Sequence, residues 1–115
     1  INENFIRCSF YELVSRYLSS CYTFAIEQHN SVGRSDFEMT GIPGTDYYTD
    51  DRVVEFKYYR MKEAEKMLAL SEPLPEHVEQ VKRYGEDTKK KFPNYNVRTY
   101  VVYICANKGW KCWEV

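Results

Sequence analysis

The chain is poor in the residues that usually build zinc sites. Its 115 residues include two histidines and four cysteines. No two cysteines form a C-x-x-C pair, and no histidine lies near a cysteine in the sequence, which argues against a zinc site. We therefore expect reduced thiols in a cytoplasmic protein, with a disulfide between Cys105 and Cys112 as the alternative. The four cysteines are Cys8, Cys21, Cys105 and Cys112.

Long hydrophobic runs are also missing. No apolar segment approaches the roughly 20 residues that a membrane-spanning helix needs, and no basic segment followed by an apolar one suggests a signal peptide. The length suffices for one domain with one core, so we expect a single domain over residues 1–115. Because the sequence begins Ile1-Asn2-Glu3 without a methionine, we interpret it as a fragment of a longer protein.

A large excess of either charge is absent, since the net charge is −1. Residues 1–58 nevertheless carry nine acidic and five basic side chains, whereas residues 80–115 carry three acidic and eight basic ones. The overall charge does not predict strong non-specific binding to DNA. The basic C-terminal part could still contact phosphates.

What the sequence does contain is a strand with an unusual pair of charges. Residues 51–59 alternate as a buried strand, with apolar side chains on one face and Glu55 and Lys57 on the other. A carboxylate and an ammonium among apolar neighbours need a partner, a metal or a chemical role. Residues 33–39 also alternate and place Asp36 and Glu38 on one face. An Asp and a Glu-x-Lys on adjacent strands can hold a divalent cation, which suits metal-assisted phosphodiester hydrolysis.

These residues carry a resemblance to a known family. Asp36 followed by Glu55-Phe56-Lys57 resembles the signature of the PD-(D/E)XK nuclease superfamily, although Ser35 stands where that signature has proline. The segment 33–37 resembles the Gly-Arg-x-Asp version of its first motif, and residues 80–84 match the Gln-x-x-x-Tyr motif of the RecB-like branch. From about residue 20 onward, the chain resembles the C-terminal nuclease-like domain that many bacterial proteins, often from Bacteroidetes, carry after an AAA-ATPase-like module.

The resemblance implies an α/β (α+β) fold with a restriction-endonuclease-like αβββαβ core, in which helices flank a mixed central sheet. Local patterns predict compatible elements: three consecutive strands with short connections favour an antiparallel meander. The first helix has an apolar stripe that includes Phe10, Leu13 and Tyr17, and we expect Met61 and Met67 in the core. The predicted elements are a helix over 3–20, strands over 21–29, 34–40 and 52–58, helices over 60–70 and 75–91, and strands over 97–105 and 110–115.

The resemblance also implies a catalytic centre. Asp36 and Glu55 would bind Mg²⁺ or Mn²⁺ together with the backbone carbonyl of Phe56. Lys57 would orient the attacking water or stabilise the transition state. The substrate would be a nucleic acid, with DNA as the expected one.

Other residues have weaker assignments. The resemblance implies that Gln80 and Tyr84 contact the phosphate backbone, and it makes Glu12 and Glu38 candidate accessory residues near the metal. The two histidines are expected to have structural or surface roles. We interpret three further acids as loop residues, one of which could replace a metal ligand: Asp46, Asp50 and Asp51.

Three functions remain open at this point. The first is a Mg²⁺-dependent nuclease domain. The second is a non-cleaving module that binds nucleic acid or regulates an attached AAA-ATPase-like domain. The third is a structural or oligomerisation domain, and homodimerisation is compatible with each of the three.

Overall fold

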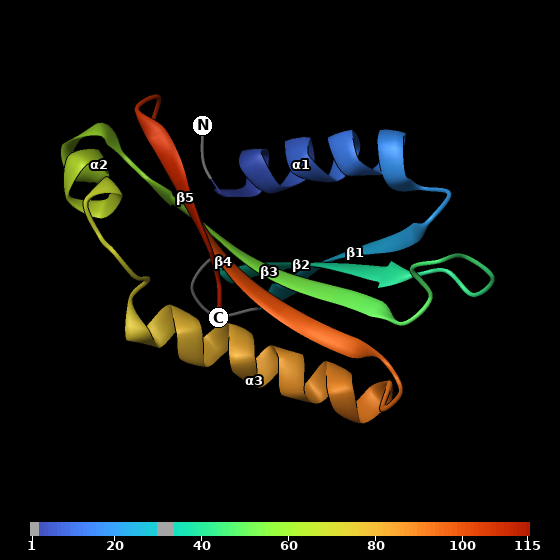
Figure 1. Ribbon diagram of the computed structural model, residues 1–115. Helices are drawn as coiled ribbons and strands as arrows, with labels where there is room; N and C mark the ends of the chain where they lie inside the picture. The colour runs from blue at the N-terminus through green and yellow to red at the C-terminus, as the bar shows by residue number, and fades with distance from the viewer. Residues whose placement is uncertain (1–2, 30–33) are drawn as a thin grey trace.

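A five-stranded sheet with helices on both sides forms the molecule (Figure 1). The computed structural model describes residues 3–29 and 34–115. Elements follow one another along the chain in the predicted order, beginning with a helix and three strands. They are α1 (Glu3–Leu18), β1 (Tyr22–His29), β2 (Arg34–Gly41), β3 (Asp50–Tyr59), α2 (Met61–Leu68), α3 (Pro75–Lys91), β4 (Asn96–Cys105) and β5 (Gly109–Glu114).

The strands lie in the sheet in sequence order, β1-β2-β3-β4-β5. The pairs β1–β2, β2–β3 and β4–β5 are antiparallel, whereas β3 and β4 are parallel. A parallel pair needs a long crossover, and α2 and α3 supply it here. The predicted meander, the mixed sheet and the αβββαβ order are therefore confirmed.

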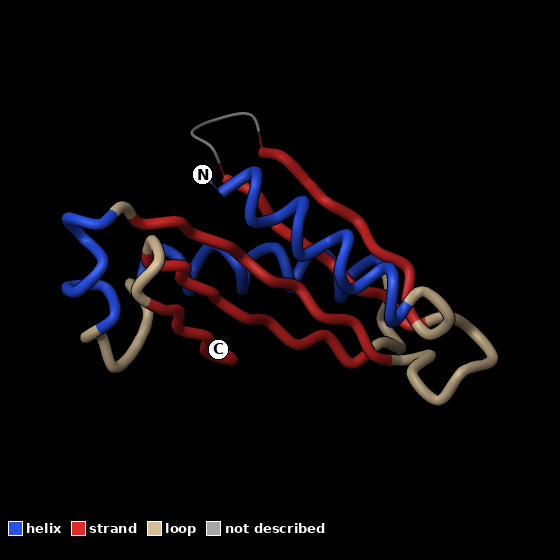
Figure 2. The backbone as a smooth tube through the Cα atoms, turned by 90° about the horizontal axis from the view of Figure 1, so that it is seen from above, coloured by secondary structure: helices blue, strands red, loops and turns tan. Residues whose placement is uncertain are grey.

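Each face of the sheet has its own core. On the first, which we call the α1 face, Phe10 and Leu18 of α1 pack against Phe37 of β2 and Phe56 of β3. On the second, the α3 face, Val81 of α3 packs with residues of α2, β3 and β4. Figure 2 shows α1 lying along the meander strands, while α3 runs beneath the sheet in Figure 1. Alternate residues of β3 and of β4 therefore belong to different cores.

Helix α3 lies very close to β4. Its buried residues are His77, Val81, Gly85 and Thr88, which recur at three- and four-residue spacing. A Cβ added at Gly85 would lie 2.6 Å from Cγ2 of Thr99 on β4. Glycine at position 85 therefore permits close contact between α3 and β4, and this contact determines the position of α3 on the α3 face.

Some predicted core positions are wrong. Leu13 and Tyr17 of α1 are 52% and 71% exposed, and Met61 is 53% exposed. Helix α1 covers the sheet with a narrower stripe than its sequence suggests. Met61 is the first residue of α2, whose buried residues are Ala64 and Met67.

The cysteines are free, as the sequence predicts for reduced thiols. The alternative disulfide is wrong, because the register pairs Cys105 with Gly109 and Cys112 with Val102. Cys105 therefore belongs to the α3 face and Cys112 to the α1 face. Within the described ranges, no helix is long and apolar enough to cross a membrane.

Candidate active site

The register of β2 and β3 brings the three predicted catalytic positions together. Asp36 pairs directly with Glu55. Directly opposed residues of antiparallel strands share one face, with Cβ atoms roughly 4.5–5.5 Å apart. Lys57 lies two residues beyond Glu55 on β3 and hence on the same face. That face is the α3 face, since Val53 of the same alternation belongs to its core.

Glu55 lies in an unusually dry position for a carboxylate. Its side chain is fully buried, and its register partner on the other side, Val101, is fully buried too. Lys57 is half-buried, and it pairs with Tyr103 of β4. Charges in such surroundings interact far more strongly than charges in water. A change in net charge at this site therefore has large energetic consequences.

Helix α3 places the two predicted substrate residues over the same face. Gln80 and Tyr84 are one helical turn apart and lie on one flank of α3. The Oε1 atom of Gln80 is buried, and Tyr84 packs against the core of the α3 face. The structure thus brings Gln80 and Tyr84 to the side of the sheet that carries Glu55 and Lys57.

A pair of acids extends the site along the same face. Asp51 is a residue of β3 and is fully buried, so its interpretation as a loop acid is wrong. Thr40 Oγ1 donates a hydrogen bond to Asp51 Oδ2 at 3.3 Å and lies 3.5 Å from Glu38 Oε2. Burial, and then the hydrogen bond and negative charge of Glu38, raise the pKa of Asp51 to about 8. Asp51 is therefore largely protonated at neutral pH.

Asp51 is the site-adjacent residue that the sequence analysis missed. The spacing indicates its face, because Asp51 precedes Glu55 by four residues and residues separated by an even number lie on the same face of a strand. The polar run before it favoured a loop instead. Asp50 is the first residue of β3, so its interpretation as a loop acid is wrong too. It faces the other way and accepts hydrogen bonds from the Tyr22 hydroxyl and, at 3.0 Å, from Arg52 Nε. Asp46 lies exposed in the loop before β3.

Glu12 is not brought to the site. It lies on α1, which covers the α1 face, whereas Glu55 and Lys57 belong to the α3 face. Its side chain is 72% exposed and forms an ion pair of 2.7 Å with Arg16, one turn along the helix. The expectation that Glu12 approaches the metal is therefore wrong, because the whole sheet separates the two.

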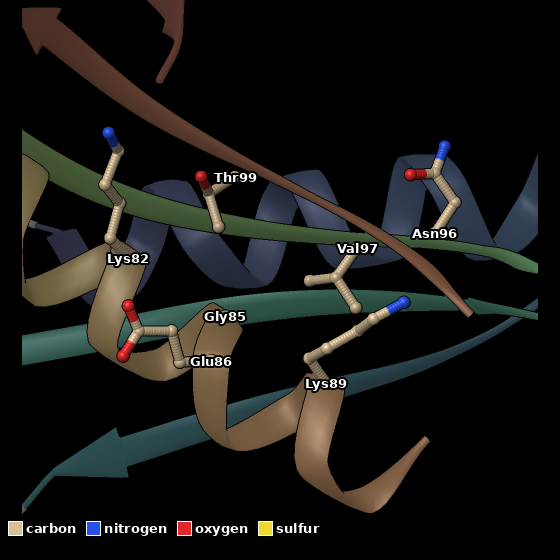
Figure 3. A pocket seen from close by; sticks show the side chains of 7 residues that line it. All are labelled: Lys82, Gly85, Glu86, Lys89, Asn96, Val97 and Thr99. Atoms are coloured by element: carbon tan, nitrogen blue, oxygen red, sulfur yellow. The ribbon is translucent and has the colours of Figure 1, made fainter. Parts of the chain in front are cut away.

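A depression of about 390 Å³ lies on the other flank of α3 (Figure 3). Lys82, Glu86 and Lys89 of α3 rise along one side of it, and Asn96 and Thr99 of β4 lie along the other. Lys89 Nζ donates a hydrogen bond to the carbonyl oxygen of Tyr95 at 2.6 Å, which holds this lysine at the rim. Two ammonium groups at one opening can attract a phosphate backbone.

Comparison with known proteins identifies the class to which this geometry belongs. A family model described as the PD-(D/E)XK nuclease superfamily matches residues 1–114. The chain therefore belongs to the PD-(D/E)XK nuclease superfamily. No curated protein and no solved structure matches the chain.

Proposed function

We propose that the domain is a metal-dependent nuclease that hydrolyses phosphodiester bonds of nucleic acid, with DNA as the substrate. The observation that carries this proposal is the pairing of Asp36 with Glu55, with Lys57 next on the same face. Family membership supports the reaction class. Membership of the RecB-like branch belongs to the same proposal and rests on Gln80 and Tyr84. Attachment to an AAA-ATPase-like module is also part of it and rests on the resemblance that begins at about residue 20.

The residues at the site fit a hard divalent cation. Magnesium takes oxygen ligands and commonly one or two protein carboxylates, which Asp36 and Glu55 would supply with the backbone carbonyl of Phe56. Among the described side chains, which do not include that of Asp36, no three His, Cys, Asp or Glu residues form a metal cluster. The proposed ligand set depends on Asp36 for this reason. When bound, Mg²⁺ or Mn²⁺ would act as a Lewis acid that stabilises charge on the scissile phosphate.

The chain's own groups would perform the remaining tasks. Lys57, beside Glu55 on the strand, would orient the attacking water and offset negative charge that develops on the phosphate. Gln80 and Tyr84 would hold the neighbouring phosphates from α3. Half-buried Lys57 acts in a partly dry environment, where a positive charge stabilises a developing anion more strongly than in water.

The depression beside α3 supports a path for the substrate backbone. Lys82 and Lys89 lie at its opening, on the flank of α3 opposite to that of Gln80 and Tyr84. A nucleic acid lying across α3 would contact both flanks, one through its scissile phosphate and the other through phosphates farther along. Glu86, also at the opening, would confine the phosphates to the two lysines.

The test is cleavage of end-labelled single- and double-stranded DNA and RNA with Mg²⁺, with Mn²⁺ and with EDTA. We expect cleavage that requires metal and falls by at least about a hundredfold in Lys57→Met. Lys62→Met is the matched control, because Lys62 is an exposed lysine of α2, and it should cleave like the wild type. Equal cleavage by Lys57→Met and the wild type would contradict the role of Lys57.

A further inference from the structure

A buried hydrogen-bond network lies directly beside Lys57. Tyr103, which is fully buried, pairs with Lys57 in the register of β3 and β4. Its hydroxyl oxygen accepts a hydrogen bond from the backbone N–H of Leu74 at 2.9 Å, and the same hydroxyl bonds Nδ1 of His77. The ring of Tyr59, two residues after Lys57, lies 5.2 Å from that of Tyr103. These contacts join the start of α3 to the end of β3.

The chemistry of the groups fixes one of these hydrogen bonds. Leu74 N–H can only donate, so the Tyr103 hydroxyl oxygen accepts from it and keeps its own hydrogen for another partner. Nδ1 of His77 lies within hydrogen-bond distance of that hydroxyl. When Tyr103 donates to Nδ1, that nitrogen carries no hydrogen and Nε2 carries the one of the neutral ring.

The surroundings of His77 agree with a neutral ring. The side chain is 9% exposed. Burial and then the positive charge of Lys57 lower the pKa of His77, while Glu76 on the same helix raises it. The charged and titratable groups that act on this ring or on its partner Tyr103 are Glu55, Lys57 and Tyr59 of β3, Tyr103 of β4, and Glu76 of α3.

We propose that His77 is a positioning residue for Lys57, held as the neutral ring by the hydrogen bond from Tyr103. A cationic imidazole would repel the Lys57 ammonium and move it away from Glu55 and the substrate. The neutral ring leaves Lys57 free of that repulsion, so its ammonium can stay beside Glu55 on the strand. The catalytic part of this proposal rests on the nuclease function proposed above, whereas the protonation state of His77 does not.

The first experiment measures that protonation state directly. Nitrogen-15 NMR distinguishes the two nitrogens of an imidazole, and His29 is the other histidine of the chain, so His29→Gln assigns the signals. We expect hydrogen on Nε2 and a pKa below the ordinary 6.5. Lys57→Met should raise that pKa, because it removes a neighbouring positive charge. A histidine that titrates at its ordinary value in both proteins would overturn the proposal, whether or not the domain cleaves nucleic acid.

The second experiment measures the pH profile of cleavage. In Tyr103→Phe, Nδ1 loses its donor and can take up a proton. A ring that titrates at the ordinary pKa of about 6.5 is about three-quarters protonated at pH 6, so the ratio of activity at about pH 6 to that at about pH 8 should fall about fourfold below the wild-type ratio. Adding His77→Asn to Tyr103→Phe removes the titrating group and should restore the wild-type ratio. Tyr100→Phe, on the α1 face of the same strand, should leave it unchanged. A low-pH loss that persists in the double variant would overturn the proposal.

The two experiments separate this inference from the proposed function. Absence of cleavage by the wild type under every metal condition would reject the nuclease function, and the NMR titration would still decide the state of His77. Should Tyr103→Phe fail to fold, His77→Asn alone provides the comparison. It should keep the wild-type ratio of activity at about pH 6 to that at about pH 8, because asparagine is neutral at both, and a fall in that ratio would overturn the proposal.

Discussion

Replacing the buried Asp51 by asparagine should change how stability depends on pH. Asp51 has an ordinary pKa of 3.8 in the unfolded chain and a raised value of about 8 in the folded chain. Between these values the folded state holds one proton more than the unfolded state. The stabilising contribution of protonated Asp51 is therefore complete below about pH 4 and is lost as the pH rises through about 8.

The expected magnitude follows from this difference. Each pH unit in the interval lowers the free energy of unfolding by about 1.4 kcal/mol. From about pH 5 to about pH 7 the wild type should therefore lose about 3 kcal/mol through Asp51. Asparagine does not titrate, and its amide can donate a hydrogen bond to Glu38 as the protonated acid can. Asp51→Asn should consequently gain about 3 kcal/mol relative to the wild type over the same interval.

Urea denaturation at a series of pH values in EDTA measures this effect. The matched control is Asp46→Asn, because Asp46 is an exposed aspartate in the loop before β3. That variant should keep the pH dependence of the wild type. If Asp51→Asn also keeps the pH dependence of the wild type, Asp51 is ionised in the folded protein and donates no hydrogen bond to Glu38.

Two further predictions concern α3. Gly85→Ala places a Cβ 2.6 Å from Thr99 Cγ2 and should lower the free energy of unfolding by about 1–2 kcal/mol, even though alanine favours helix. Thr99→Ser removes that methyl group and can keep the hydrogen bond from the hydroxyl to the carbonyl oxygen of Val115. Thermal or urea denaturation should therefore show that the double variant Gly85→Ala with Thr99→Ser is more stable than Gly85→Ala alone. Lys82→Ala with Lys89→Ala should weaken binding of DNA in EDTA and reduce the slope of log affinity against log salt by about 1.5. The control variant Lys62→Ala with Lys66→Ala, on α2, should have the slope of the wild type. Equal slopes in the two double variants would show that Lys82 and Lys89 do not contact phosphates.

The sheet and the strand faces could be predicted from the sequence because strand alternation is a local property. A period of two puts Glu55 and Lys57 on one face whatever lies around them. The short connections between the first three strands then make adjacent pairing the natural arrangement. Asp36 reaches the position opposite Glu55 through that pairing.

The side of the sheet on which Glu12 lies and the burial of Asp51 depend on tertiary structure and could not be predicted in this way. The family resemblance suggested Glu12, and the spacing within α1 does not show which face of the sheet that helix covers. The structure places α1 on the face opposite to Glu55. Asp51 looks like a loop residue because two aspartates in succession are typical of turns, and nothing in that run indicates that the side chain at position 51 is fully buried.

His77 illustrates the same limit in a helix. Its helix is strongly polar, and nothing near it in the sequence distinguishes a buried histidine from an exposed one. Its partner Tyr103 is 26 residues away and reaches it only because β4 lies parallel to β3 under the start of α3. A pattern of spacing within one element does not reveal such a contact.

The most direct test of the central claim, that Asp36 and Glu55 form one metal site, is calorimetric titration of Mn²⁺ and Mg²⁺ into the domain. The wild type should bind metal, and Asp36→Asn and Glu55→Gln should each abolish binding, while Asp46→Asn should bind like the wild type. Circular dichroism of each variant verifies that the fold is kept. Undiminished binding in either site variant would contradict the account, as would absence of binding by the wild type both alone and with a short oligonucleotide.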